Sequence, residues 1–169
     1  TRKALVVGAG PAFKKEGVKL LREIYRPFRY RSASQISKWE EKRPLVRACD
    51  GALPLFQEAN EQPDIIVSVD GSDIIGKFYW NLKWSWPPTP KVLLATSVHP
   101  TTTQIIQEKG WPIYWWQALT PNKTFLIDGI TKINAGGNVG TASWVIAHCI
   151  LNCTKVGLLG MEFSWSDYT

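Results

Sequence analysis

The fold of this chain is decided by the stretch Pro63-Asp64-Ile65-Ile66-Val67-Ser68-Val69-Asp70-Gly71-Ser72-Asp73. Its apolar run, Ile65 to Val69, is short and continuous, which predicts a buried strand. A similar run, Leu45 to Cys49, is followed by Asp50-Gly51. One Asp-Gly pair alone indicates a tight turn. Two such pairs at equivalent strand ends favour a ligand site, because ligands of open α/β sheets bind beyond the carboxyl ends of the strands.

Strands alternate with helices along the whole chain. The predicted strands are Lys3 to Gly8, Leu45 to Cys49, Ile65 to Val69, Lys91 to Thr96, Pro112 to Trp116 and Lys155 to Gly160, with a further possible strand at Thr124 to Asp128. The predicted helices are Ala12 to Tyr25, Ser34 to Glu41, Ala52 to Ala59, Ser72 to about Lys83, Thr101 to Lys109 and Ala142 to Leu151. This alternation predicts an α/β fold with a doubly wound, mostly parallel sheet and helices on both faces.

Composition is that of one globular domain. The chain has 169 residues, of which 44% are hydrophobic and 20% charged, so residues 1–169 are predicted to form a single domain. No apolar run is long enough to span a bilayer. The abrupt beginning at Thr1-Arg2-Lys3 suggests a piece of a longer protein.

The net charge and the cysteines indicate which partners the protein binds and in which cellular compartment it is expected. A net charge of +6 attracts phosphates, but no nucleic-acid-binding signature is present, so no specific nucleic acid is expected. Cys49, Cys149 and Cys153 form no zinc or disulfide pattern and are interpreted as reduced, mostly buried thiols of a cytoplasmic protein. His148 is expected in the core or at an interface, whereas His99 at a strand end faces the predicted crevice.

Nine tryptophans are a high number for this length, and several lie in the middle third. We expect at least one of Trp80 and Trp84 to pack into the core and Trp86, beside Pro87, to lie nearer the surface. If they are exposed together, the segment is expected to contact a second subunit or a missing domain.

Two glycine-rich turns precede predicted helices. Gly8-Ala9-Gly10-Pro11 joins the first strand to a helix, and the backbone N–H groups at such a helix start bind anions. The turn is not a dinucleotide fingerprint, because the third glycine of that pattern falls at Phe13. The second turn, Gly136-Gly137-Asn138-Val139-Gly140-Thr141, offers backbone flexibility and Asn138 or Thr141 as a cap or ligand group. We predict that Gly8, Gly10, Pro11, Gly136, Gly137, Asn138 and Thr141 bind a nucleotide.

Five ordered motifs resemble one Rossmann-like family, which includes 6-hydroxymethyl-7,8-dihydropterin diphosphokinases and motility accessory factors. The motifs are Val7 to Pro11, Ala48 to Ala52, Pro63 to Asp70, Gly136 to Thr141 and Gly160 to Ser164. The central stretch is also similar to thiamine pyrophosphokinase, in which aspartates hold Mg²⁺ while a diphosphate moves from ATP to a hydroxymethyl group.

The resemblance implies roles for three aspartates. Asp50 and Asp70 would bind Mg²⁺ during diphosphoryl transfer from ATP to a pterin-like acceptor. The diphosphokinases carry two aspartates separated by one residue, and the first of these falls at Val69 here. Asp73 is the nearby substitute and is included in the predicted catalytic and metal-binding set.

The same motifs are similar to a sialyltransferase-like group, which implies an alternative reaction. That group binds a nucleotide sugar across the equivalent turns, so the alternative is glycosyl transfer from a CMP-linked sugar. Glu162 occupies a position at which these relatives usually carry aspartate. A third interpretation is a nucleotide-binding module without catalytic activity.

Overall fold

A single parallel sheet forms the centre of the molecule. The computed structural model describes residues 2–26, 43–84, 87–119 and 126–164. Seven strands lie in the order β6-β5-β4-β3-β2-β1-β7 and pair in parallel throughout. They are β1 (Lys3–Val7), β2 (Leu45–Cys49), β3 (Ile65–Ser68), β4 (Lys91–Ala95), β5 (Ile113–Ala118), β6 (Thr131–Ile133) and β7 (Lys155–Leu159). The predicted strands that begin at Lys3, Leu45, Ile65, Lys91 and Lys155 are confirmed as members of one sheet, and the strand predicted at Pro112 to Trp116 corresponds to β5 in the same sheet.

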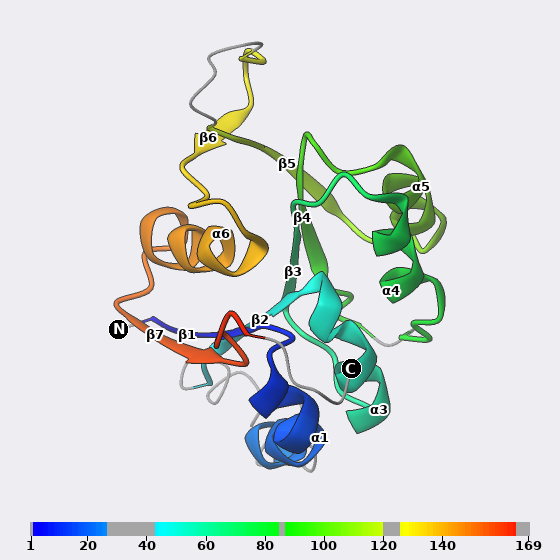
Figure 1. Ribbon diagram of the computed structural model, residues 1–169, viewed down its shortest axis with the longest axis vertical. Helices are drawn as coiled ribbons and strands as arrows, with labels where there is room; N and C mark the ends of the chain where they lie inside the picture. The colour runs from blue at the N-terminus through cyan, green and yellow to red at the C-terminus, as the bar shows by residue number, and fades with distance from the viewer. Residues whose placement is uncertain (1, 27–42, 85–86, 120–125, 165–169) are drawn as a thin grey trace.

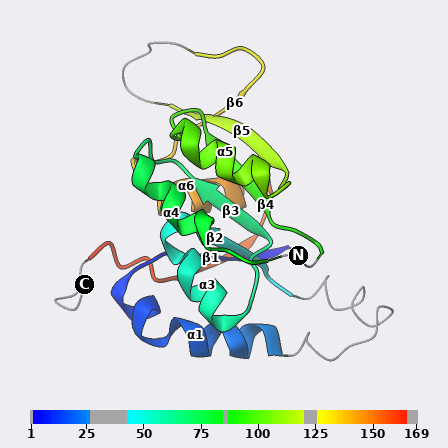
Figure 2. The ribbon, with the colours of Figure 1, turned by 90° about the vertical axis from the view of Figure 1, so that its right-hand side faces the viewer.

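Helices cover both faces of this sheet, as predicted. From β1 to β6 the chain adds each strand beside the previous one, so α1 (Pro11–Tyr25), α3 (Leu53–Ala59), α4 (Gly76–Trp80) and α5 (Pro100–Glu108) share one face (Figures 1 and 2). The return from β6 to β7 carries α6 (Val139–Val145) and the π-helical turn η4 (Ile146–Ile150) across the opposite face (Figure 1). The sheet order therefore reverses between β1 and β7, and such a reversal is where open α/β sheets bind ligands.

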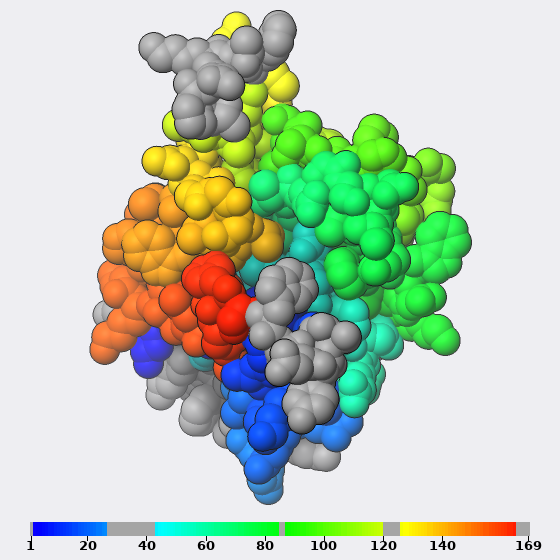
Figure 3. Space-filling model, viewed as in Figure 1, coloured from blue at the N-terminus to red at the C-terminus, as the bar shows by residue number. Residues whose placement is uncertain are grey.

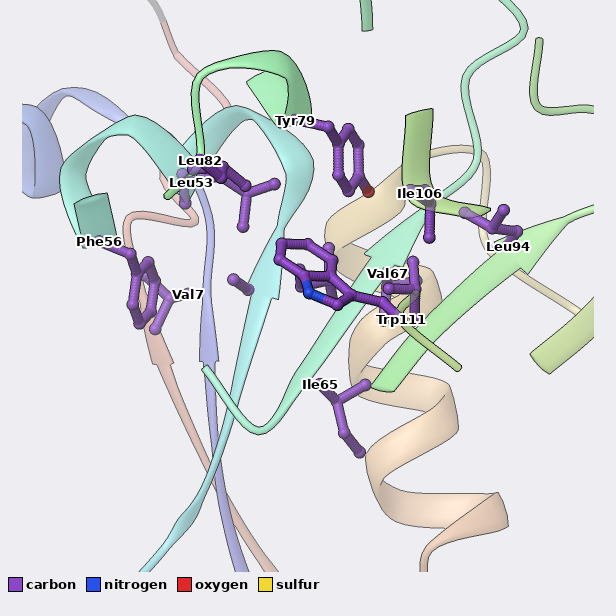
Figure 4. Close-up of a cluster of buried hydrophobic side chains, with 14 of the residues drawn as sticks. Val7, Leu53, Phe56, Ile65, Val67, Tyr79, Leu82, Leu94, Ile106 and Trp111 are labelled. Atoms are coloured by element: carbon purple, nitrogen blue, oxygen red, sulfur yellow. The ribbon is translucent and has the colours of Figure 1, made fainter. Parts of the chain in front are cut away.

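The core lies mainly between the sheet and the α1–α5 layer. Leu53, Phe56, Tyr79 and Ile106 project from this layer toward the sheet residues Val7, Val67 and Leu94 (Figure 4). Trp84 is 4% exposed and stacks on Trp111 with ring centroids 5.8 Å apart, which confirms a core tryptophan in this segment. Trp80 is 67% exposed, and Trp86 lies outside the described residues.

Several predicted element bounds were wrong. The helix predicted to reach Lys83 ends at Trp80, because the chain turns at Asn81 and places Trp84 against Trp111. The strand predicted at Thr124 to Asp128 is absent from its described part, residues 126–128, and β6 forms at Thr131–Ile133 instead. The predicted helix at Ser34 to Glu41 lies outside the described residues.

The environment of Cys149 differs from expectation, and that of His148 excludes the core but leaves the expected interface location a prediction. Cys49 and Cys153 are buried as predicted, but Cys149 is exposed. His148 is exposed as well, and its ring stacks on exposed Trp144 with centroids 5.4 Å apart. Neither sits in the core, because the turn η4 directs both side chains away from the sheet. No helix among the described residues is long and apolar enough to cross a bilayer.

Candidate functional site

The turn after β1 leaves the start of α1 available to an anion. β1 ends at Val7, and Pro11 opens α1 in the position that needs no N–H donor. Gly10 is the N-cap residue and makes no side-chain capping bond, and the first turn of α1 carries no acidic residue. The first N–H groups of this 15-residue helix therefore lack a capping side chain. This is the arrangement in which helix starts bind phosphate.

The chain that follows β7 lies directly against this turn. The N–H of Gly8 donates to Leu159 O at 2.8 Å, and the N–H of Gly10 donates to Gly160 O at 2.8 Å. A Cβ on Gly10 would lie 1.8 Å from Glu162 Oε2. The fold thus brings Glu162, which was not in the predicted set of site residues, to the reversal point between β1 and β7.

Met161 links the two predicted glycine turns. A Cβ on Gly8 would lie 2.7 Å from Met161 Sδ, and a Cβ on Gly140 would lie 2.1 Å from Met161 Cε. The side chain of Met161 therefore fills the space between the β1–α1 turn and the start of α6. The turns that contain Gly8 and Gly140 therefore lie on either side of Met161. Their participation in one site stays a prediction.

The side chains of Asn138 and Thr141 form hydrogen bonds within the α6 turn itself. Asn138 Oδ1 accepts from Thr141 N at 2.9 Å, and Thr141 Oγ1 lies 2.9 Å from Asn138 O and also bonds Ala135 O. Gly136 and Gly137 adopt φ of +64° and +90°, a backbone region that side chains disfavour. This turn would therefore contact a ligand through its backbone groups.

Asp50 is a buried carboxylate at the end of β2. It is 6% exposed and opens a short 3-10 turn, η2 (Asp50–Ala52). Its Oδ1 accepts from Gly51 N at 2.8 Å, and its Oδ2 accepts from Ser68 Oγ at 2.7 Å. Burial raises the pKa of the Asp50 carboxyl, the two hydrogen bonds oppose that rise, and the charge of Asp70 adds to it. Asp70 is therefore near enough to act on Asp50 electrostatically.

Asp70 and Asp73 are exposed to solvent in the loop after β3. Asp70 Oδ1 accepts from Ser72 N at 2.9 Å, and Asp73 opens the 3-10 turn η3 (Asp73–Ile75). Within the described part of the chain, no group of at least three His, Cys, Asp or Glu side chains is arranged to hold a metal. A magnesium site here would consist of one or two carboxylates completed by water and phosphate, which is the usual environment of Mg²⁺.

The edge that carries these residues is recessed. In Figure 3 the cyan surface around the ends of β2 and β3 lies between the yellow start of α6 and the green α4 segment. His99 lies farther along this edge, where its Nδ1 accepts from Thr101 N at 3.3 Å and caps α5. That bond gives His99 a structural role.

A cavity of about 1140 Å³ lies elsewhere, toward the amino ends of the strands. Its walls include Leu45, Lys91, Tyr114 and Ile150, and none of the predicted site residues lines it. The cavity and the predicted site residues therefore lie in different parts of the molecule. We place the candidate site at the carboxyl edge, because the buried carboxylate, the uncapped helix start and both glycine turns lie there.

Comparison with known proteins agrees with the fold and with the family resemblance. The family model described as 6-hydroxymethylpterin diphosphokinase MptE-like matches residues 1–168. No curated protein sequence matches the chain. Among solved structures, the chain is similar to the MAf glycosyltransferase from Magnetospirillum magneticum AMB-1, with a TM-score of 0.62 and 13% identity. That match covers 98% of this chain and 26% of the solved chain, so this chain spans about a quarter of that protein.

Proposed function

Because the chain belongs to the MptE-like family, we propose that it is a nucleotide-binding transferase that moves a diphosphoryl group from ATP to a pterin-like acceptor. The hydroxymethyl oxygen of the acceptor bonds to the β-phosphorus of ATP. The bond from that phosphorus to the oxygen it shares with the α-phosphorus breaks, and AMP leaves with the bonding electrons. The proton of the hydroxymethyl group passes to solvent.

The observation that carries this proposal is the pair Asp50 and Asp70. Asp50 is a buried carboxylate at the end of β2, and Asp70 follows the neighbouring strand β3. Burial is the main cause that raises the pKa of the Asp50 carboxyl, and the negative charge of Asp70 adds to it, so a bound cation would stabilise both carboxylates in their charged forms. Asp50 and Asp70 would hold Mg²⁺, with Asp73 assisting from the start of η3. The bound ion would neutralise the phosphates of ATP.

Backbone groups would hold the nucleotide. The uncapped start of α1, reached through Gly8 and Gly10, suits a phosphate. Gly136 and Gly137 would approach the nucleotide through their backbone, since the side chain of Asn138 caps α6 and that of Thr141 donates to carbonyl groups of the same turn.

The direct assay measures AMP formed from ATP in the presence of a reduced hydroxymethylpterin. Asp70→Ala should lower the rate on the order of 100-fold, since it removes a proposed metal ligand. Asp128→Ala is the matched control, because Asp128 is an exposed carboxylate in the turn before β6. Absence of pterin-dependent AMP formation by the unaltered protein with Mg²⁺ would contradict the proposal.

One observation favours the alternative, glycosyl transfer from a CMP-linked sugar. The carboxylate of Glu162 lies against Gly10, where it would repel a polyphosphate. A carboxylate is a good acceptor for ribose or sugar hydroxyl groups, and CMP carries a single phosphate. The likeness to the MAf glycosyltransferase supports the shared fold.

Thermal stability separates these functions. A ligand at 100 times its Kd adds about 2.7 kcal/mol to the free energy of unfolding. Stabilisation by ATP with Mg²⁺ supports the diphosphokinase, and stabilisation by CMP without metal supports the glycosyltransferase. Binding of either nucleotide without turnover of any acceptor supports a non-catalytic nucleotide-binding module.

A further inference from the structure

Three buried side chains form a hydrogen-bonded chain that ends at Asp50. Ser68, the last residue of β3, places Oγ 2.7 Å from Asp50 Oδ2 and 2.7 Å from Tyr79 Oη. Ser68 and Tyr79 are both 0% exposed. Tyr79 reaches this point from α4, with its ring in the core and its oxygen directed toward the strands (Figure 4).

The direction of the chain follows from counting hydrogens. The hydroxyl of Ser68 has a single hydrogen, and the Asp50 carboxylate accepts it. The remaining contact is then made by Tyr79, which donates its hydroxyl hydrogen to Ser68 Oγ. Burial raises the pKa of Tyr79 well above its ordinary value, which keeps this hydroxyl protonated.

These hydrogen bonds leave the Asp50 carboxylate able to bind a ligand. Among the described residues, each carboxylate oxygen of Asp50 accepts a single hydrogen bond, from Gly51 N or from Ser68 Oγ, so each oxygen keeps a free lone pair toward this part of the protein. Asp64, a carboxylate at the amino end of β3, is instead paired with Arg43. Among the described residues no Lys or Arg forms an ion pair with Asp50. Its orientation is therefore fixed by neutral donors, and its charge is not neutralised.

We propose that Ser68 and Tyr79 are positioning residues, which hold the Asp50 carboxylate in the orientation that meets the nucleotide and its cation. The inference rests on the proposed function for the identity of that ligand. It extends the site from the strand ends to α4, which also follows the loop carrying Asp70 and Asp73. The hydrogen bonds of Ser68 and Tyr79 thus connect Asp50, which follows β2, with α4, which follows the loop that carries Asp70 and Asp73.

The test compares two tyrosine variants that each remove one buried hydroxyl. Tyr79→Phe breaks the chain to Asp50. Tyr25→Phe is the matched control, because Tyr25 is also buried and donates to Gln62 O at 2.8 Å, away from the strand ends that carry Asp50 and Ser68. Ser68→Ala removes the direct donor to Asp50. Folding is checked for all three variants by circular dichroism.

The first measurement needs no ligand. In protein labelled with ¹³C at aspartate Cγ, Ser68→Ala and Tyr79→Phe should shift the Asp50 resonance, and Tyr25→Phe should leave it in place. The second measurement is the Kd of the nucleotide that stabilises the unaltered protein. Ser68→Ala should raise that Kd by about 10- to 100-fold, Tyr79→Phe by a smaller factor, and Tyr25→Phe should not change it.

The outcomes separate this inference from the proposed function. An unshifted Asp50 resonance in both variants overturns the inference whether or not nucleotide binds. Nucleotide binding that is unchanged in Ser68→Ala also overturns it and leaves the proposed function standing. If the unaltered protein binds no nucleotide, the proposed function fails, and the positioning role in nucleotide binding fails with it, even where the resonance shifts.

Discussion

At the scale of single residues, Arg47 carries the largest buried polar group without a hydrogen-bond partner in the described structure. It lies in the middle of β2 and is 0% exposed. Within the part of the chain that the structure describes, its Nε, Nη1 and Nη2 atoms have no hydrogen-bond partner. Burial lowers the pKa of the guanidinium to about 10, although the nearby thiols of Cys153 and Cys49 act in the opposite direction. A buried cation without a partner costs stability.

This cost leads to a stability prediction. Arg47→Met keeps a long side chain and removes the buried charge, so it should raise the free energy of unfolding by about 1–4 kcal/mol. Arg22→Met is the control, because Arg22 is exposed and its replacement should change stability by less than about 0.5 kcal/mol. Urea titration measures both. A clear loss of stability in Arg47→Met would mean that an anion or water pairs with Arg47 in solution.

Residues of the candidate site differ in how far the sequence could predict them. Asp50 was predictable because an apolar strand precedes it and a glycine follows it. Ser68 and Tyr79 were not, because their link to Asp50 depends on how β3 and α4 pack. Glu162 was named as a substitution but left out of the site, since only the pairing of β7 with β1 brings it to Gly10.

At the scale of elements, the junction of β1 and β7 leaves little room at Gly8. A Cβ there would lie 2.4 Å from Gly160 O, and a backbone oxygen cannot move without disturbing the strand pairing. Gly8→Ala should therefore cost about 1–3 kcal/mol of stability. Gly140→Ala is the comparison, because its closest contact is the end of the Met161 side chain at 2.1 Å, which can rotate away.

The two alanine variants should differ in thermal midpoint. Gly140→Ala also gains helix propensity within α6, which offsets part of any crowding, so its stability should stay close to that of the unaltered protein. Equal losses in both variants would contradict the close packing of the β1–α1 turn on the segment after β7. Calorimetry of both proteins at one pH decides between these results.

Elements with continuous apolar runs were predictable, and short polar ones were not. The largely apolar runs predicted β2 and β3 closely, because a strand buried on both faces consists mainly of apolar residues. Arg47 in β2 and Ser68 in β3 are buried polar exceptions. β6 has three residues, Thr131–Ile133, and two of them are exposed. Its pairing with β5, and not its composition, makes it a strand. α4 ends early because the stacking of Trp84 on Trp111 outweighs local helix propensity.

At the scale of the whole molecule, one main core cluster joins the two faces of the sheet. It includes Phe13, Leu53 and Trp84 on the α1–α5 side and Ile146 from the opposite side. A smaller cluster of Ala4, Val6, Ala147 and Cys153 lies under the end of η4. Both clusters share β1 and its neighbours, so we expect the described residues to unfold as one cooperative unit.

Two probes on opposite faces test this cooperativity. The stacked pair Trp84 and Trp111 reports on the α4–α5 side through near-ultraviolet circular dichroism. Thiol labelling in a Cys149→Ser background reports on the other side, because Cys49 lies 3.8 Å from Ser143 Oγ of α6 and Cys153 follows η4, and both are buried. The midpoints of the two guanidinium titrations should coincide, as expected for a single domain. Labelling that is complete at a lower denaturant concentration than the loss of the tryptophan signal would contradict this. It would show that α6, η4 and β7 open as a separate unit before the rest of the sheet unfolds. The turns at Gly8 to Pro11 and Gly136 to Thr141, which are proposed to bind the nucleotide, would then become exposed first.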